Sequence, residues 1–391
     1  MFADRTNWNL STNLLADALA RHRAGGRKLL DLSASNPTEC GFTHDGSAIM
    51  RALCNPSALG YHPNPRGLKS AREAVSEYYA GFGARIALED MVLTTSTSEA
   101  YSFVFRLLCN PGDELLVPAP SYPLFEFLAD IQDVKLVRYP LFYDHGWHAD
   151  FHALQQAVTS RTRGVIVVHP NNPTGHFTKP SALARLNEIS AAADLAIIAD
   201  EVFLDFSLDA RHPRSFAVNN GALTFTMSGL SKISGLPQMK LAWLIVSGPE
   251  ERKREALDRL EVIADTYLSL NAPIQLAARA LLEQRHDFQD QLLARVRKNL
   301  AELDSQLSAQ KNCGRLEVEG GWYAVLRVPA TRPDEELAIA LLEKHDVYVH
   351  PGHFYGFPGD GYLVVSLITP EPEFAEGTRR IISRLAEISE R

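Results

Sequence analysis

Three polar residues of this sequence each follow an apolar run that is typical of a β-strand, and together they could carry out amine chemistry. Lys232 lies in a turn of small residues directly after one such run, and Asp200 and Asn172 each follow an earlier run. Ligands of open parallel sheets bind at the carboxyl ends of the strands, so we expect the three side chains along one sheet edge. A pyridine-aldehyde cofactor needs these groups: an amine to form an imine, an anion for the ring nitrogen and a donor for the ring hydroxyl.

Each of the three residues also has an ordinary interpretation. A single Ser-x-x-Lys segment usually carries a surface lysine, an aspartate after a strand can cap a helix or a turn, and Asn-Asn-Pro-Thr-Gly at 171–175 favours a plain turn. Lys240 follows Lys232 across a Gly-Leu-Pro turn, and a second cation there would lower the pKa of the first amine and keep it nucleophilic. Three such endings on successive strands favour a common site over three unrelated turns.

A segment rich in hydroxyl groups could bind a phosphate. Ser96, Thr97 and Ser98 stand where a strand is expected to pass into a helix, and the free peptide N–H groups of a helix N-terminus bind anions. The same residues, followed by Glu99, also fit an ordinary capping box. In the stiff Pro-Ser-Tyr-Pro loop that comes next, Tyr122 could stack on a flat ring or could be a packed core tyrosine.

The composition is that of a globular enzyme and argues against several other classes. The chain has 391 residues, which is too many for a single core, so two domains are expected. Its net charge of −8 disfavours a nucleic-acid partner, and no apolar run approaches the roughly 20 residues of a membrane helix. The cysteines lack metal-site spacing and the N-terminus lacks an apolar signal core, so we expect a reduced, cytoplasmic protein without a bound metal.

From residue 91 onward, short apolar runs alternate with helical segments. This alternation predicts an α/β fold with a mainly parallel sheet covered by helices on both faces. The seven expected strands are 91–94, 114–118, 134–139, 164–169, 195–199, 223–227 and 241–247.

After residue 247 the pattern changes to long helices and then to shorter segments that are typical of an antiparallel sheet. The expected antiparallel segments are 316–319, 323–328 and 363–367. We therefore predict a large domain at 46–270 and a smaller α+β domain formed by 1–45 together with 271–391.

The order of the motifs resembles the aspartate aminotransferase family, the fold type I pyridoxal-phosphate enzymes, over nearly the whole chain. Each motif is weak alone, but the ordered series is specific. The matching motifs are Ser-Asn-Pro-Thr at 35–38, Tyr61 with a following Pro and Gly, Thr-Ser-Glu-Ala at 97–100, Pro-Ser-Tyr-Pro at 120–123, Asn-Asn-Pro-Thr-Gly at 171–175, Asp-Glu-Val at 200–202, Ser-Lys at 231–232 and Pro-Gly at 351–352.

The resemblance implies a fold type I pyridoxal-phosphate transferase that exchanges an amino group between an amino acid and a 2-oxo acid. Lys232 would form the Schiff base with pyridoxal 5'-phosphate and carry a proton between the substrate Cα and the cofactor. Asp200 would pair with the pyridine nitrogen, and Tyr122 would stack on the ring. Asn172 would donate to the ring O3′ and would also face the substrate.

The resemblance also assigns the phosphate site and a partner subunit. The expected phosphate ligands are Ser96, Thr97, Ser98 and Lys240. Tyr61 is similar to the tyrosine that reaches the phosphate of the neighbouring subunit, which implies a homodimer with shared active sites.

Several positions depart from the family. Phe203 stands where a tyrosine usually assists the asparagine, which should raise the pKa of the imine. Lys240 replaces an arginine with a point charge, and Gly229 replaces a hydroxyl residue. Val364 stands in place of the arginine that binds the substrate carboxylate, and the dicarboxylate-selecting arginine usually found near 267–271 has no match.

The missing arginine leaves two possibilities open. Either Arg327 or Arg66 binds the substrate carboxylate, since a bidentate arginine–carboxylate pair is the strongest anchor available, or the substrate is not a standard α-amino acid. The second possibility permits a lyase or another pyridoxal-phosphate reaction on an unusual amino compound. A cofactor-binding regulator would need a DNA-binding domain of ~60–80 residues, for which this acidic chain has no room. The amino donor and acceptor do not follow from the sequence.

Overall fold

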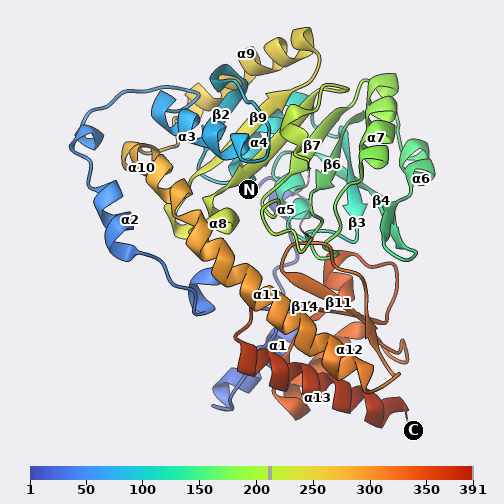
Figure 1. Cartoon of the computed structure of the whole chain (residues 1–391). Helices are drawn as coiled ribbons and strands as arrows, with labels where there is room; N and C mark the ends of the chain where they lie inside the picture. Colours follow the sequence, from blue (N-terminus) through green and yellow to red (C-terminus); the bar gives the residue numbers. More distant parts are fainter. Residues whose placement is uncertain (210–213, 390–391) are drawn as a thin grey trace.

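The large sheet of the computed structural model contains the seven strands expected from the sequence and one more (Figure 1). The structure describes residues 1–209 and 214–389. The strand order is β2-β9-β8-β7-β6-β3-β4-β5, and the four pairings from β8 to β4 are parallel. The strands are β2 Met91–Thr94, β3 Glu114–Ala119, β4 Lys135–Tyr143, β5 Trp147–Ala149, β6 Thr162–Val168, β7 Ala196–Asp200, β8 Thr224–Gly229 and β9 Ala242–Ser247.

The expected number of seven strands was one too few. The additional strand, β5, has three residues and pairs antiparallel with the end of β4 at the edge of the sheet. A strand this short has no detectable periodicity, so only its pairing identifies it.

Alternate residues of the central strands pack on opposite faces of the sheet. Ile198 of β7 packs in a cluster with α4 (Thr97–Leu108) and α9 (Glu250–Tyr267), whereas its neighbour Ile197 packs in a cluster with α7 (Pro180–Ala193). Because both faces are covered, β7 and β8 are buried at every residue. This explains why these strands read as continuous apolar runs.

A second, antiparallel sheet has the order β10-β11-β14-β13 and lies below the large sheet in Figure 1. Its strands are β10 Gly314–Arg315, β11 Tyr323–Arg327, β13 His350–Pro351 and β14 Tyr362–Ser366. The expected strand at 316–319 was wrong. The ladder with β11 ends at Arg315, and after one more hydrogen bond from Leu316 N to β11 the chain turns toward the loop at 171–175, where Glu319 N donates to Gly175 O. A separate parallel pair joins β1 Leu30–Asp31 to β12 Val347–Tyr348.

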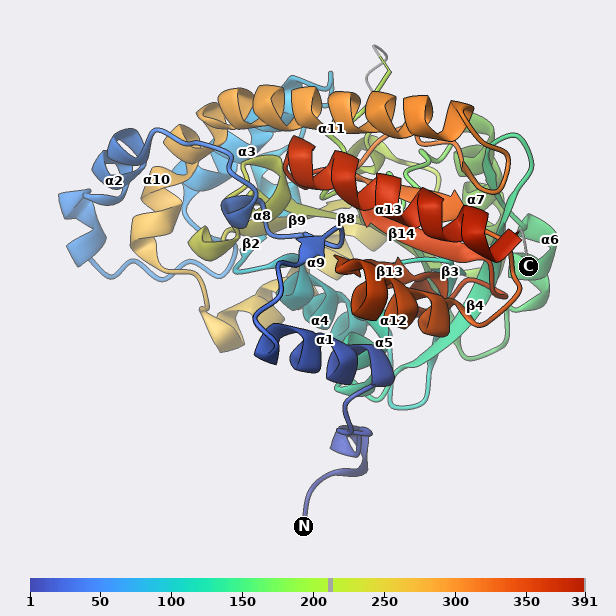
Figure 2. The ribbon, with the colours of Figure 1, turned by 90° about the horizontal axis from the view of Figure 1, so that it is seen from below.

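Four helices surround the smaller sheet: α1 Leu14–Ala24, α11 Arg285–Ser308, α12 Asp334–His345 and α13 Glu371–Ser389. Figure 2 shows α11 beside α13 and α12 beside α1. The N-terminal segment is therefore part of the structure built by the last hundred or so residues, as the pairing of β1 with β12 also requires.

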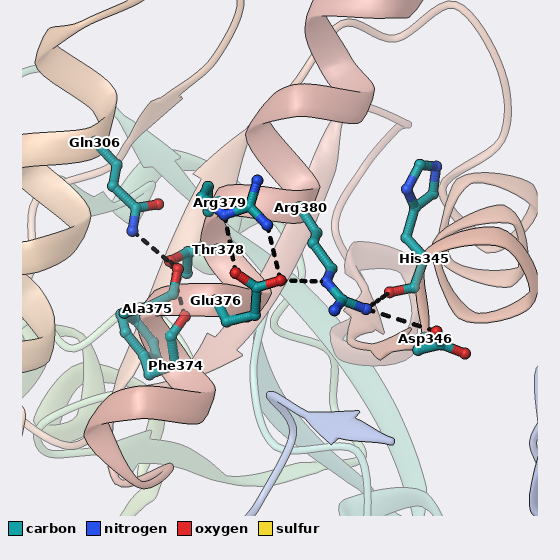
Figure 3. Close-up of polar contacts among 9 residues, drawn as sticks. All are labelled: Gln306, His345, Asp346, Phe374, Ala375, Glu376, Thr378, Arg379 and Arg380. Atoms are coloured by element: carbon teal, nitrogen blue, oxygen red, sulfur yellow. Dashed lines mark hydrogen bonds and ion pairs between the residues drawn. The ribbon is translucent and has the colours of Figure 1, made fainter. Parts of the chain in front are cut away.

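Polar contacts from α13 fix its position against its two neighbours (Figure 3). Gln306 of α11 donates to the Ala375 carbonyl at 2.9 Å. Arg380 donates to the carbonyl of His345 at 2.7 Å, and Glu376 accepts from the same guanidinium at 2.7 Å. These bonds satisfy the carbonyl at the end of α12 and hold the helix layer together.

Helix α10 (Ala272–Glu283) is separated from α11 at Gln284. α10 packs on α2 (Gly46–Leu53) and α3 (Lys69–Ala80), while α11 continues to the smaller sheet. The domain division at residues 46–270 stays a prediction. Within residues 1–209 and 214–389, no helix has the length and apolar content to cross a membrane.

Candidate active site

A cavity of about 330 Å³ lies at the carboxyl ends of β6, β7 and β8 and is lined by Lys232, Asp200 and Asn172. The three side chains therefore meet at one edge of the sheet, as the sequence predicted. The opposite wall comes from the smaller sheet and its loops and includes Tyr323 and Tyr355. The cavity thus lies where the two sheets meet.

Lys232 belongs to the short helix α8 (Leu230–Ile233), which follows β8 directly. Its Nζ lies 5.0 Å from the ring centre of Trp322 and 3.5 Å from the carbonyl oxygen of Ser35. Burial lowers the pKa of Lys232 to about 8, and the charge of Asp200 opposes this shift. A larger fraction of neutral amine is then present near pH 7, as a nucleophile requires.

The expected cause of this low pKa was wrong. Lys240 was expected to lower the pKa of Lys232 by its charge, but Lys240 is exposed at the end of a short 3-10 turn and does not line the cavity. Burial among aromatic rings produces the shift instead.

Asp200 ends β7 and is held by two donors. Its Oδ1 accepts from the Val202 N–H and its Oδ2 accepts from the Tyr101 hydroxyl, both at 3.1 Å. Burial raises the pKa of Asp200 to about 6, and the two hydrogen bonds and the charge of Lys232 limit the rise. The carboxylate is therefore buried but still ionised at neutral pH.

Tyr101 was not identified from the sequence. It lies on α4, four residues after Thr97, and both side chains line the cavity. Residues four apart share one helix face, so the position of Thr97 at the site is the signal that would have indicated Tyr101.

Asn171 and Asn172 have different environments in the same turn. The Asn171 amide donates to the carbonyl of Pro120 and to Thr174, and its oxygen accepts from Ser121. Asn172 is buried, and its Oδ1 has no hydrogen-bond partner among the described residues. Leaving a buried polar atom unpaired costs about 1–3 kcal/mol, so the Asn172 amide fits a site for a polar ligand group.

The hydroxyl-rich segment forms the capping box considered for it, and its role in binding a phosphate stays a prediction. Ser96 is the N-cap of α4: its Oγ accepts from Glu99 N at 3.2 Å, and the Glu99 carboxylate accepts from Thr95 N. Thr97 and Ser98 line the cavity at the first turn of the helix, where peptide N–H groups have no intrahelical acceptor. This helix N-terminus can hold an anion.

Tyr122 lines the cavity from the loop after β3 and packs edge-to-face on Phe125, with the ring centres 5.6 Å apart. Gly229, at the end of β8, also lines the cavity. A Cβ at this position would lie 2.8 Å from the Cβ of Ala242, so the close approach of β8 to β9 explains why no hydroxyl residue stands there.

Besides Lys240 and Ser96, three further candidate residues do not line the cavity. Arg66 donates to Glu261 at 2.7 Å and to the Glu89 carbonyl at 2.6 Å, and Arg327 is exposed at the end of β11. Tyr61 is 77% exposed and borders a different surface depression near Asn271. Neither arginine therefore supplies a cation to the cavity wall of this chain.

A mainly parallel sheet with a lysine, an aspartate and a helix N-terminus around one cavity is the arrangement of fold type I pyridoxal-phosphate enzymes. Residues 27–373 match the family of class I and II aminotransferases. The chain belongs to this family.

Individual relatives agree with this assignment. The chain is 33% identical over 260 residues to the glutamate-pyruvate aminotransferase AlaA of Escherichia coli, which corresponds to 66% of this chain and 64% of that protein. The matched region thus spans less than two thirds of that relative. An alanine aminotransferase of Mycobacterium bovis is 28% identical over 375 residues, or 93% of this chain and 86% of that protein.

A solved structure shows the same fold. The alanine aminotransferase from Pyrococcus furiosus has a TM-score of 0.88 to this chain and covers 99% of it, with 100% of its own chain matched, at 24% identity. Pyridoxal 5'-phosphate is the cofactor of this class. The Asp200 carboxylate and the open N-terminus of α4 fit its ring nitrogen and its phosphate. The unpaired Oδ1 of Asn172 is an acceptor and fits the ring hydroxyl in its protonated form.

Proposed function

We propose that this protein is a pyridoxal-phosphate-dependent aminotransferase that exchanges an amino group between an amino acid and a 2-oxo acid. The observation that carries the proposal is the meeting of the Lys232 amine, the Asp200 carboxylate and the unpaired Asn172 amide in one cavity. When bound, the cofactor supplies an electron sink for the substrate Cα.

We assign the following roles to the side chains around the cofactor. Asp200, with Tyr101 donating to it, keeps a proton on the ring nitrogen. Asn172 pairs with the ring hydroxyl, and Tyr122 packs on the ring. Lys232 would take the proton from the substrate Cα and deliver it to the cofactor carbon C4′, a transfer for which a pKa of about 8 suits an amine.

The phosphate would lie at the N-terminus of α4, with Thr97 and Ser98 as hydroxyl donors. Ser96 caps this helix, because its Oγ accepts from the Glu99 N–H, and its hydroxyl proton remains available for the phosphate. Lys240 would contribute charge from the surface only.

We also propose a homodimer in which Tyr61 reaches the partner's phosphate. Exposed apolar side chains surround this region: Leu59 is 94% exposed and Leu268 is 41% exposed. Such clusters mark interaction surfaces. Sedimentation would show a dimer, and an active monomer would contradict this proposal. A cytoplasmic location, supported by four unpaired cysteines, is part of the same proposal.

The direct test is chemical. Borohydride reduction of the purified holoprotein, followed by peptide mass spectrometry, should find the cofactor attached to Lys232. The lyase alternative rests on the absence of an arginine from the described cavity wall. Incubation with an amino acid separates the two, because an aminotransferase converts the bound cofactor to its pyridoxamine form, whereas elimination releases ammonia. Attachment at another lysine would overturn the proposal.

A further inference from the structure

The cavity wall lacks an evident partner for a substrate carboxylate. Val364 stands in β14 where the resemblance implies an arginine, and it is 1% exposed. Among the described residues that line the cavity, only Lys232 and His350 have basic side chains. Lys232 is engaged in the chemistry, so His350 is the remaining candidate.

The strand register places His350 beside the position of the missing arginine. His350 of β13 is the direct antiparallel partner of Val364 in β14. Side chains of directly opposed residues lie on the same face of a sheet, with Cβ atoms about 4.5–5.5 Å apart. An imidazole at position 350 therefore occupies the face from which an arginine at position 364 would extend.

Neighbouring aromatic residues fix the imidazole. Its Nδ1 lies 3.0 Å from the hydroxyl oxygen of Tyr355, and the rings of Tyr348 and Phe354 each lie 5.8 Å from it, centre to centre. Burial raises the pKa of Tyr355 well above its usual value, so the phenol keeps its proton and can donate to Nδ1.

This hydrogen bond determines what the other ring nitrogen can do. Burial lowers the pKa of His350, so the imidazole is neutral near pH 7 in the free protein. With Nδ1 as acceptor, the proton is on Nε2, which has no acceptor among the described residues. An N–H group without a partner in the cavity wall is suited to bind a carboxylate.

We propose that His350, oriented by Tyr355, binds the α-carboxylate of the amino acid and of the 2-oxo acid. The inference rests on the proposed aminotransferase function and assigns the substrate anchor of the same cavity. One N–H group replaces the two of a bidentate arginine, so the anchor is weaker and less directional. His350 is the specificity-determining residue for acids over amines.

The test compares donors that differ only in the carboxylate. The twenty common L-amino acids are first screened with the holoprotein for conversion of the cofactor to its pyridoxamine form. The best donor is then compared with its own carboxamide, in wild type, His350→Ala, His350→Gln and His353→Ala. His353 is an exposed neighbour outside the cavity and serves as the matched control.

We expect His350→Ala to weaken the apparent affinity for the acid by about 10- to 100-fold, as for the loss of a hydrogen bond to a charged group. The apparent affinity for the carboxamide should change by less than about threefold, and the cofactor content of the protein should stay unchanged. His350→Gln keeps an N–H donor and should recover part of the loss, and His353→Ala should behave as wild type.

A second readout does not depend on turnover. Propionate carries a carboxylate and no amine, and its binding is followed through the absorbance of the bound cofactor. Its affinity should fall in His350→Ala and not in His353→Ala.

Equal losses for acid and amide, or unchanged propionate binding in His350→Ala, would overturn the assignment of His350 and leave the aminotransferase proposal intact. If none of the amino acids converts the cofactor of the wild-type holoprotein to its pyridoxamine form, the proposed function fails. Propionate binding then still decides the role of His350.

Discussion

The hydroxyl oxygen of Tyr101 lies 3.1 Å from Oδ2 of Asp200, which joins the first turns of α4 to the end of β7. The bond stabilises the ionised carboxylate and limits the rise of its pKa, which burial brings to about 6. The same helix that presents its N-terminus to the phosphate thus also positions the aspartate. Phosphate and ring sites are coupled through one rigid element.

Replacing Tyr101 by phenylalanine should therefore impair catalysis through Asp200. Loss of the donor destabilises the charged form, so the pKa of Asp200 rises and the acidic limb of the kcat–pH profile moves to higher pH. A hydrogen bond to a charged group contributes about 1.5–3 kcal/mol, which raises the pKa of Asp200 by about one to two units, so kcat at pH 7 should fall about 2- to 15-fold. Tyr139→Phe is the control, because it also removes one buried hydrogen bond, to the Ile166 carbonyl, outside this cavity. An unmoved acidic limb in Tyr101→Phe would contradict this role.

Substitution of the two adjacent asparagines should have opposite effects. Asn171→Ala removes three hydrogen bonds that hold the turn and should lower the free energy of unfolding by about 2–3 kcal/mol. Asn172→Ala removes an atom that is buried and unpaired, so the apoprotein should be no less stable, while cofactor affinity should fall at least about fivefold. Urea unfolding of the apoprotein and cofactor titration measure the two quantities. Equal destabilisation by both changes would show that Asn172 is structural.

Phe203→Tyr should restore the hydroxyl that the family usually has. Phe203 lines the cavity and packs edge-to-face on Trp322, with ring centres 4.9 Å apart, so the new hydroxyl group can extend toward the cofactor ring. One added hydrogen bond of about 1.4 kcal/mol should lower the pH midpoint of the absorbance transition of the bound cofactor by about one unit. A spectroscopic pH titration measures this midpoint. A midpoint that is unchanged or higher in Phe203→Tyr would show that the new hydroxyl group does not bond to the cofactor ring.

The pH dependence of stability should reflect Glu201. This fully buried carboxyl accepts from Ser215 and from the Phe216 N–H, and burial raises its pKa to about 8. Its folded pKa lies above the unfolded value, so the native state binds an extra proton between about pH 4.5 and 8. The free energy of unfolding should therefore fall by up to about 1.4 kcal/mol per pH unit as pH rises through this window.

Glu201→Gln removes this titration and should flatten the slope. Urea unfolding at pH 5.5 and pH 8 compares the variant with wild type. Identical slopes in the two proteins would assign the pH dependence to other groups.

Much of the fold followed from the sequence for a physical reason. Strands such as β7 and β8 are covered on both faces, so they appear as apolar runs with clear ends. Parallel strands align their carboxyl ends, and this alone placed Lys232, Asp200 and Asn172 at one edge. The edge strand β5 and the irregular segment 316–319 were not predicted correctly, because their structure depends on pairing and contacts with residues that are distant in the sequence.

The sequence by itself determined the residue types of the site and the edge of the sheet that carries them. The tertiary structure alone decided which side chains act together. Tyr101 meets Asp200 because α4 packs on the sheet face formed by β8 and β9, next to β7, and Ser96 caps that helix while Thr97 lines the cavity. That position 364 is valine is visible in the sequence, but that His350 lies opposite it depends on the register of two strands. Periodicity reports which face of an element is buried, whereas contacts between elements depend on how the separate segments pack.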